Sequence, residues 1–122
     1  MKNVKGPDFV ALQVPDIEKS AQFYSEVLGL KRAPQSPPDA VLFLTAPIPF
    51  AVRKPLGNLP VGEKQLGLGV ALWFLCKNSI ELYERLKSNN VVILDEPTPG
   101  PFGLTFRFKD PDGYVITIHD KS

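Results

Sequence analysis

The sequence predicts one α+β domain made of two copies of a strand–helix–three-strand (βαβββ) module. The first observation is a repeat, because the phrase Phe9–Val14 returns in similar form as Gly69–Phe74, about half of the 122-residue chain later. The second observation is that each copy reads as a β-rich strand followed by a plausible amphipathic helix. Repeats on this scale are typical of two supersecondary units that share a core.

The first module is predicted over about residues 7–54. Its first strand stops at Pro15, Asp16 is a good helix N-cap, and apolar residues at helical spacing continue as far as Gly29, which ends the helix. Three further short strands are expected at residues 30–33, 41–46 and 50–54, with a proline-rich loop over 34–39.

The second module is predicted over about residues 67–120, after a glycine- and proline-containing linker at about 55–66. Asn78 is expected to cap the second helix, with Glu81 in capping-box register. The inner stripe of that helix is interpreted as Ile80, Tyr83 and Leu86 or Lys87. The remaining elements are strands at 68–76, 91–94, 102–109 and 114–119, a loop at 97–101 and a β-turn at 110–113.

The bulk composition is that of an ordinary soluble globule, with 43% hydrophobic residues, 22% charged residues and a net charge of +1. Nothing in this balance predicts binding to nucleic acid or to a membrane surface. The single cysteine, Cys76, excludes an internal disulfide and is interpreted as a packed thiol. No secretory signal is visible, and a cytoplasmic location is expected.

Three segments of the chain resemble the vicinal oxygen chelate superfamily, which includes glyoxalase I, extradiol dioxygenases, fosfomycin-resistance transferases and bleomycin-resistance proteins. They are Val10–Asp16 running into Phe23-Tyr24 and Leu28–Leu30, the repeat strand at Val70, and Phe106–Tyr114. The resemblance implies sheets curled into a cup with helices outside, and a homodimer. Strand alternation then places a set of side chains toward the cup: Phe9, Ala11, Gln13, Gly69, Ala71, Trp73, Thr105, Arg107, Val115, Thr117 and His119.

Metal-dependent members of that superfamily hold a divalent ion with His, Glu or Gln side chains. The resemblance puts the four ligand positions at Phe9, Ala51, Gly69 and Thr117. Such ions need converging nitrogen or oxygen donors, and these four side chains do not supply them. No metal or other cofactor is therefore expected, and the enzyme interpretation is weakened.

The candidate ligand-binding residues are Phe9, Gln13, Trp73, Thr105, Arg107, Thr117 and His119. Phe9 and Trp73 together suggest an apolar sandwich for an aromatic ligand, although either can be core instead. Arg107 can clamp a ligand carboxylate or form an ion pair with a neighbouring strand. His119 is a weak candidate for a general base, the alternative being a half-exposed histidine near the chain end.

The preferred hypothesis is a metal-independent binding protein that sequesters a small organic, aromatic compound in the manner of bleomycin-resistance proteins. The first alternative is a lyase, isomerase or dioxygenase of the vicinal oxygen chelate type. The second is a protein-interaction module whose cup is filled by its own side chains.

Overall fold

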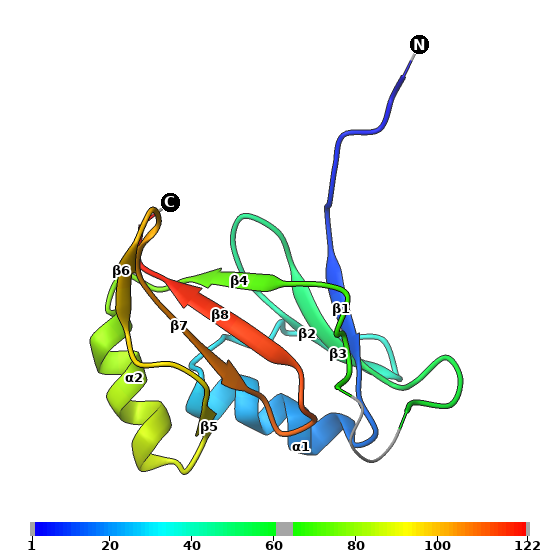
Figure 1. Cartoon of the computed structure of the whole chain (residues 1–122). Coiled ribbons are helices and arrows are strands. Elements are labelled where there is room, and N and C mark those ends of the chain that lie inside the picture. Colours follow the sequence, from blue (N-terminus) through cyan, green and yellow to red (C-terminus); the bar gives the residue numbers. More distant parts are fainter. Residues whose placement is uncertain (1, 61–64, 122) are drawn as a thin grey trace. The chain divides into compact units, whose positions relative to one another are not determined.

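The computed structural model describes residues 2–60 and 65–121, which fall into two compact units, Met1–Leu59 (unit 1) and Pro60–Ser122 (unit 2) (Figure 1). The boundary between the units lies in the segment expected to be the linker, residues 55–66. Residues 61–64 of that segment lie outside the described residues. Within the described parts, no helix is long and apolar enough to cross a lipid bilayer.

The described residues of unit 1 form one three-stranded sheet and one helix. Its elements, in chain order, are β1 (Val10–Gln13), α1 (Ile17–Gln22) continued by the π-helical turn η1 (Phe23–Val27), β2 (Ala40–Phe43) and β3 (Phe50–Arg53). The strand order is β1-β3-β2, with β1 and β3 parallel and β2 and β3 antiparallel. The predicted cap of α1 is confirmed, because the Lys19 amide donates a hydrogen bond of 3.1 Å to Asp16 Oδ1.

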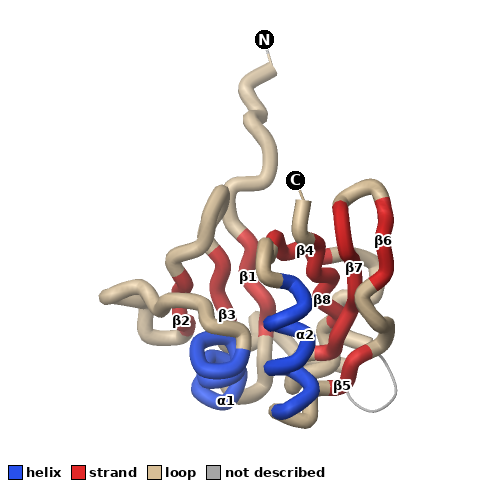
Figure 2. The backbone as a smooth tube through the Cα atoms, turned by 90° about the vertical axis from the view of Figure 1, so that its left-hand side faces the viewer, coloured by secondary structure: helices blue, strands red, loops and turns tan. Residues whose placement is uncertain are grey.

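The described residues of unit 2 form a five-stranded sheet and one helix. Its elements are β4 (Leu72–Leu75), α2 (Ser79–Ser88), β5 (Val92–Ile93), β6 (Thr98–Gly100), β7 (Gly103–Lys109) and β8 (Val115–His119). The strand order is β4-β8-β7-β5, and β6 forms a hairpin with β7 (Figure 2). The predicted turn before β8 is present, since the Gly113 amide donates to the Asp110 carbonyl over 3.1 Å.

The two units share one topology. In each, the first strand pairs in parallel with the last, and the last pairs antiparallel with the strand before it. The second-to-last strand of each unit has one more neighbour. In unit 2, β5 pairs with β7, and in unit 1 a single bridge joins Arg32 to Phe43 of β2. The α+β class and the internal repeat expected from the sequence are therefore both present.

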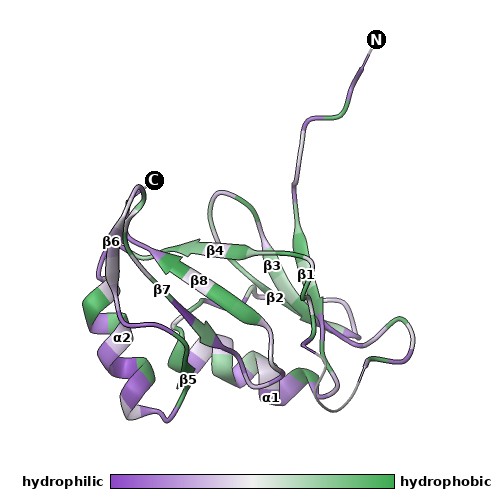
Figure 3. Ribbon diagram, in the orientation of Figure 1, coloured by the Kyte–Doolittle hydropathy of each residue, from purple (hydrophilic) through white to green (hydrophobic). Residues whose placement is uncertain are grey.

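Each helix covers one face of its own sheet, and the other face carries the candidate site residues. In unit 1 the Tyr24 ring of η1 lies 5.0 Å from the Phe50 ring. In unit 2 the Tyr83 ring of α2 lies 5.4 Å from the ring of Phe106, which is fully buried. Both helices carry hydrophilic as well as hydrophobic residues, as a helix between core and solvent must (Figure 3).

Several sequence-based expectations are corrected by the structure. The strand expected at residues 30–33 is reduced to the bridge at Arg32, and the strand expected at 68–76 begins only at Leu72. The loop expected at 97–101 contains β6, where Pro99 is tolerated because β6 pairs with one neighbour among the described strands.

The interpretation of α2 was also partly wrong. Leu82 and Leu86 form its buried stripe, whereas Ile80 is 49% exposed. The capping box is absent, because the Asn78 side chain makes no capping hydrogen bond. Ser79 instead donates its hydroxyl to Asp120 Oδ2 over 3.0 Å, which holds the start of the helix against the end of β8.

Candidate functional site

The open face of the unit 2 sheet brings five of the predicted site residues together. Two rows of directly paired residues cross β4, β8 and β7. One row is Trp73, Thr117 and Arg107, and the next is Leu75, His119 and Thr105. Since side chains alternate along a strand, both rows project from the face opposite Phe106 and α2.

Three aromatic rings form an exposed cluster on this face. The ring of Trp73 lies 5.8 Å from that of Phe102 and 5.6 Å from that of His119, and the Phe102 and His119 rings are 6.1 Å apart. All three pairs meet edge to face. We call this cluster the aromatic triad (Trp73, Phe102 and His119). Trp73 and Phe102 are 49% and 50% exposed, so the triad is not part of the buried core.

Phe102 was missed by the sequence interpretation. The sequence predicts Phe102 only as the first residue of a strand. In the structure it precedes β7, and the Lys121 amide donates to its carbonyl over 3.0 Å. That bond ties the turn between β6 and β7 to the chain end, so that the Phe102 ring reaches across to β4. No local sequence pattern signals this long-range placement.

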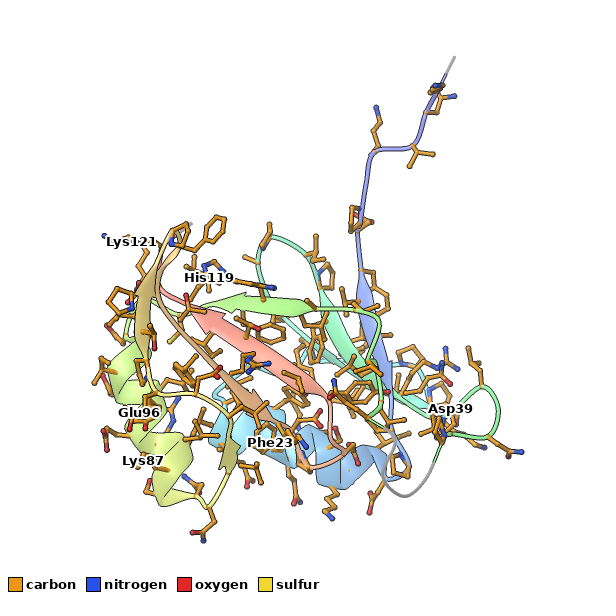
Figure 4. The ribbon with its side chains drawn as sticks, in the orientation of Figure 1. Phe23, Asp39, Lys87, Glu96, His119 and Lys121 are labelled. Carbon is orange, nitrogen blue, oxygen red and sulfur yellow. The ribbon has the colours of Figure 1, made fainter. Side chains whose placement is uncertain are left out.

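The hydrogen bonding of His119 determines what its ring offers. Its Nδ1 lies 2.8 Å from the carbonyl oxygen of Lys121, and both residues lie at the end of β8 (Figure 4). A carbonyl oxygen can only accept, so Nδ1 carries the hydrogen. In the neutral imidazole, Nε2 is then an acceptor, and it has no partner among the described residues. His119 can therefore accept a hydrogen bond from a bound molecule.

Arg107 is engaged by a carboxylate of its own unit. Its Nε donates to Asp95 Oδ2 over 2.7 Å and its Nη2 donates to Asp95 Oδ1 over 3.0 Å. This bidentate bond, more than the charge attraction, lowers the pKa of the Asp95 carboxyl, against a smaller opposing effect of burial. The same contact raises the pKa of Arg107. The ion pair is the alternative that the sequence left open for Arg107.

The two threonines differ in exposure. Thr117 is buried at the centre of the Trp73–Thr117–Arg107 row, so it forms the floor beside the triad. Thr105 is partly exposed, and its hydroxyl donates to the Gly103 carbonyl over 3.3 Å. Both belong to the same face as the triad, as the sequence predicted.

Phe9 and Gln13 belong to unit 1. Phe9 is exposed, and Gln13 Oε1 accepts a hydrogen bond of 2.8 Å from the Leu56 amide. Because Trp73 belongs to unit 2, the expected sandwich of Phe9 and Trp73 stays a prediction.

Unit 1 contains a pocket of about 280 Å³ on the open face of its sheet. Its lining comes from the residue before β1, from all three strands and from the loop before β2: Phe9, Ala11, Pro37, Pro38, Asp39, Ala40, Leu42, Ala51 and Arg53. Unit 2 contains a larger and more open hollow of about 480 Å³ between α2 and the segment after β5. That hollow includes Lys87 and Glu96 in its lining (Figure 4).

The four positions that the sequence resemblance assigned to metal ligands do not fit a divalent ion. Phe9, Ala51 and Gly69 have no donor atom in their side chains, and the Thr117 hydroxyl is a poor ligand. Among the described residues, no group of three or more His, Cys, Asp or Glu side chains is placed to hold a metal ion.

Cys76 lies at the end of β4, where its amide donates to the His119 carbonyl over 2.9 Å. Leu75 is the residue paired with His119, so strand alternation directs the Cys76 side chain to the opposite face of the sheet from the imidazole. A thiol–imidazole nucleophile is therefore not formed by these two neighbours.

The chain is similar to known proteins both in sequence and in structure. Residues 6–118 match the family described as the Glyoxalase/Bleomycin resistance protein/Dioxygenase superfamily. The uncharacterized protein YetH of Bacillus subtilis is 29% identical over 91% of this chain and 94% of its own. The phenazine antibiotic resistance protein EhpR of Enterobacter agglomerans is 23% identical over 92% of this chain and 89% of its own. Among solved structures, TnmS3, an antibiotic binding protein from Streptomyces sp. CB03234, shares the fold with a TM-score of 0.77, 23% identity and full coverage of both chains.

Proposed function

The chain belongs to the glyoxalase/bleomycin resistance protein/dioxygenase superfamily, and from that premise we propose that it is a metal-independent binding protein that sequesters a planar aromatic compound. The observation that carries the proposal is the aromatic triad. Rings that are half exposed on an open sheet face offer stacking surface at little conformational cost. The acceptor nitrogen of His119 adds one polar contact to this apolar surface.

The ligand class is supported by the named relatives. EhpR is described as a phenazine antibiotic resistance protein and TnmS3 as an antibiotic binding protein. Both descriptions fit a binding role, and phenazines are flat, fused-ring molecules. We therefore propose a fused-ring antibiotic or toxin as the physiological ligand, held by a homodimer in the cytoplasm.

Trp73 is the only tryptophan of the chain, so its fluorescence reports on the triad alone. The purified protein is titrated with a panel of fused-ring compounds that includes phenazine, acridine and naphthalene derivatives. A saturable change in fluorescence that persists in excess chelator is expected. A panel in which no compound changes the signal would overturn the proposal.

Calorimetry then compares two matched variants with the wild type. Trp73→Ala should lower the affinity for the tightest-binding compound about tenfold or more, which corresponds to roughly 1.4 kcal/mol of binding free energy. Ile80→Ala is the control, because Ile80 is equally exposed, at 49%, but lies on α2 behind the sheet. If Trp73→Ala and Ile80→Ala bind that compound with equal affinity, the triad does not bind the ligand.

The enzyme alternative has one observation in its favour. In the neutral imidazole, the hydrogen bond to the Lys121 carbonyl puts the hydrogen on Nδ1 and leaves Nε2 as an acceptor, which is the tautomer that a general base needs. No carboxylate assists the ring in the described chain, since its other nitrogen is held by a backbone carbonyl. Conversion of any bound compound on incubation, lost in His119→Asn, would favour this alternative over sequestration.

A further inference from the structure

The pocket on the open face of unit 1 is lined mainly by small and apolar side chains. Ala11 of β1 and Ala51 of β3 are directly paired, and Leu42 of β2 pairs with Ala51 on the other side. We call this pocket the unit 1 slot, defined by Phe9, Ala11, Leu42, Ala51, Arg53 and the loop residues 37–39. Ala11 is exposed, whereas Ala51 is only 1% exposed, so a ligand in the slot contacts Ala11 and the larger side chains around it.

The dimensions of the slot favour a small planar molecule. A volume of about 280 Å³ is near the lower end of the range for ligand sites, roughly 300–1,000 Å³. Its lining is largely apolar and includes Phe9, an exposed aromatic residue that can stack on a ligand. A ligand of one or two aromatic rings matches this space.

Arg53 gives the slot a cationic end. Its Nε donates to the Lys54 carbonyl over 3.0 Å, which fixes the direction of the guanidinium. Arg32 and Arg107 form ion pairs with Glu18 and Asp95, whereas Arg53 has no acidic partner within the described residues. Arg53 is partly buried, and its two Nη groups form no ion pair among the described residues, so its fork of donors can meet a ligand carboxylate.

We propose that the unit 1 slot binds a planar aromatic carboxylate, with the ring against Ala11 and the carboxylate on Arg53. The inference rests on the proposed function, in that the chain binds an aromatic small molecule. It assigns a separate site on unit 1 to aromatic ligands that carry a carboxylate, and it names the residue that anchors them.

Asp39 sets the limit on ligand charge. It is one of the residues that line the slot, it belongs to the loop before β2, and it is exposed (Figure 4). A second acidic group on the ligand would approach this carboxylate, so the slot favours a monoanion over a dianion. Asp39→Asn should therefore improve the binding of an aromatic dicarboxylate relative to a monocarboxylate.

The test uses two probes that differ only in charge, 2-naphthoate and 2-naphthamide. Calorimetry on the wild-type protein should give at least tenfold tighter binding of the acid, weakening as salt is added. Arg53→Gln should lower the affinity for the acid at least tenfold and leave the affinity for the amide unchanged. Arg32→Gln is the control, because its charge is identical but its guanidinium is paired with Glu18.

A second variant tests the location without touching the charge. Ala11 is exposed, so Ala11→Leu fills the slot with little effect on the core, and it should weaken both probes. Equal affinity for acid and amide, or unchanged acid binding in Arg53→Gln and Ala11→Leu, would overturn the inference. Either result leaves the proposed function standing if Trp73→Ala still weakens a fused-ring compound, so the two failures are distinguishable. Absence of binding by both probes also overturns the inference.

Discussion

The carboxylate of Asp120 occupies the space in which a side chain of residue 103 would begin, and Gly103 leaves that space open. Oδ1 of Asp120 accepts a hydrogen bond of 2.9 Å from the Leu104 amide, and Oδ2 accepts one of 3.0 Å from the Ser79 hydroxyl. One side chain after β8 therefore fixes the start of β7 and the start of α2. The positive φ of Gly103, 83°, is a second reason for glycine at this position.

Gly103→Ala is expected to destabilise the protein for both reasons. The strained backbone alone costs about 1–3 kcal/mol, and displacement of Asp120 adds the loss of its two hydrogen bonds. Urea unfolding followed by circular dichroism measures the free energy of unfolding. Gly113→Ala is the matched control, since its φ is 93° but an added Cβ meets no atom within 4 Å. Equal losses in the two variants would show that Asp120 contributes nothing.

Asp16→Ala is expected to lower the free energy of unfolding by about 1 kcal/mol, within the range of roughly 0.5–2 kcal/mol measured for helix N-caps. The reason is the hydrogen bond from the Lys19 amide to Asp16 Oδ1, which the variant removes. Asp8→Ala removes the same charge from the exposed segment before β1 and serves as the control. A loss in Asp8→Ala as large as that in Asp16→Ala would assign the effect to charge rather than to capping.

The Asp95–Arg107 pair predicts a specific response to acid. Because the folded-state pKa of Asp95 is lowered, the pair stabilises the protein above the ordinary Asp pKa of 3.8. That contribution is lost as the pH falls through the lowered folded value. The stability difference between wild type and Asp95→Asn should thus be small but present at neutral pH and vanish in strong acid. The pair is exposed to solvent, which keeps the effect small.

Urea midpoints measured from neutral pH down to below pH ~3 check this expectation, because that range spans the ordinary carboxylate pKa. Glu96→Gln is the control, since it removes a neighbouring negative charge that makes no ion pair in the described part of the chain. A difference between wild type and Asp95→Asn that grows toward acid would contradict the lowered pKa.

The fold was predictable because its determinants are local in sequence. The alternation in Val10–Gln13, the cap at Asp16 and the turn at Asp110–Gly113 each specify a short element, and the repeat supplies the order of elements. The errors arose where tertiary pairing overrides local preference. Pro99 reads as a loop residue, but an edge strand tolerates it.

The candidate site was predictable only in part. Strand alternation correctly put Trp73, Arg107, Thr117 and His119 on one face of the unit 2 sheet. Alternation did not predict the position of Phe102, which depends on the backbone hydrogen bond between Lys121 and Phe102. It also did not predict the contact of Arg107 with Asp95, because the two residues are twelve positions apart. Such contacts depend on how distant segments pack against one another, and no local pattern in a single sequence predicts them.

The two nitrogens of His119 can be tested separately. Asn reproduces the Nδ1 donor to the Lys121 carbonyl but has no group at the position of Nε2, whereas Gln reaches the position of Nε2. For a fused-ring ligand with a hydroxyl or amine donor, His119→Asn should weaken binding about five- to tenfold, the value of one net hydrogen bond of roughly 1–1.4 kcal/mol. His119→Gln should recover part of that loss.

The matched ligand is the same ring system without the donor, and its affinity should be the same in His119→Asn and His119→Gln. Fluorescence of Trp73 reads out both titrations, because the indole and imidazole rings are 5.6 Å apart. If the two ligands lose affinity equally in His119→Asn, the imidazole contributes ring surface and not an acceptor. The hydrogen bond to Lys121 would then serve only to hold the ring against Trp73.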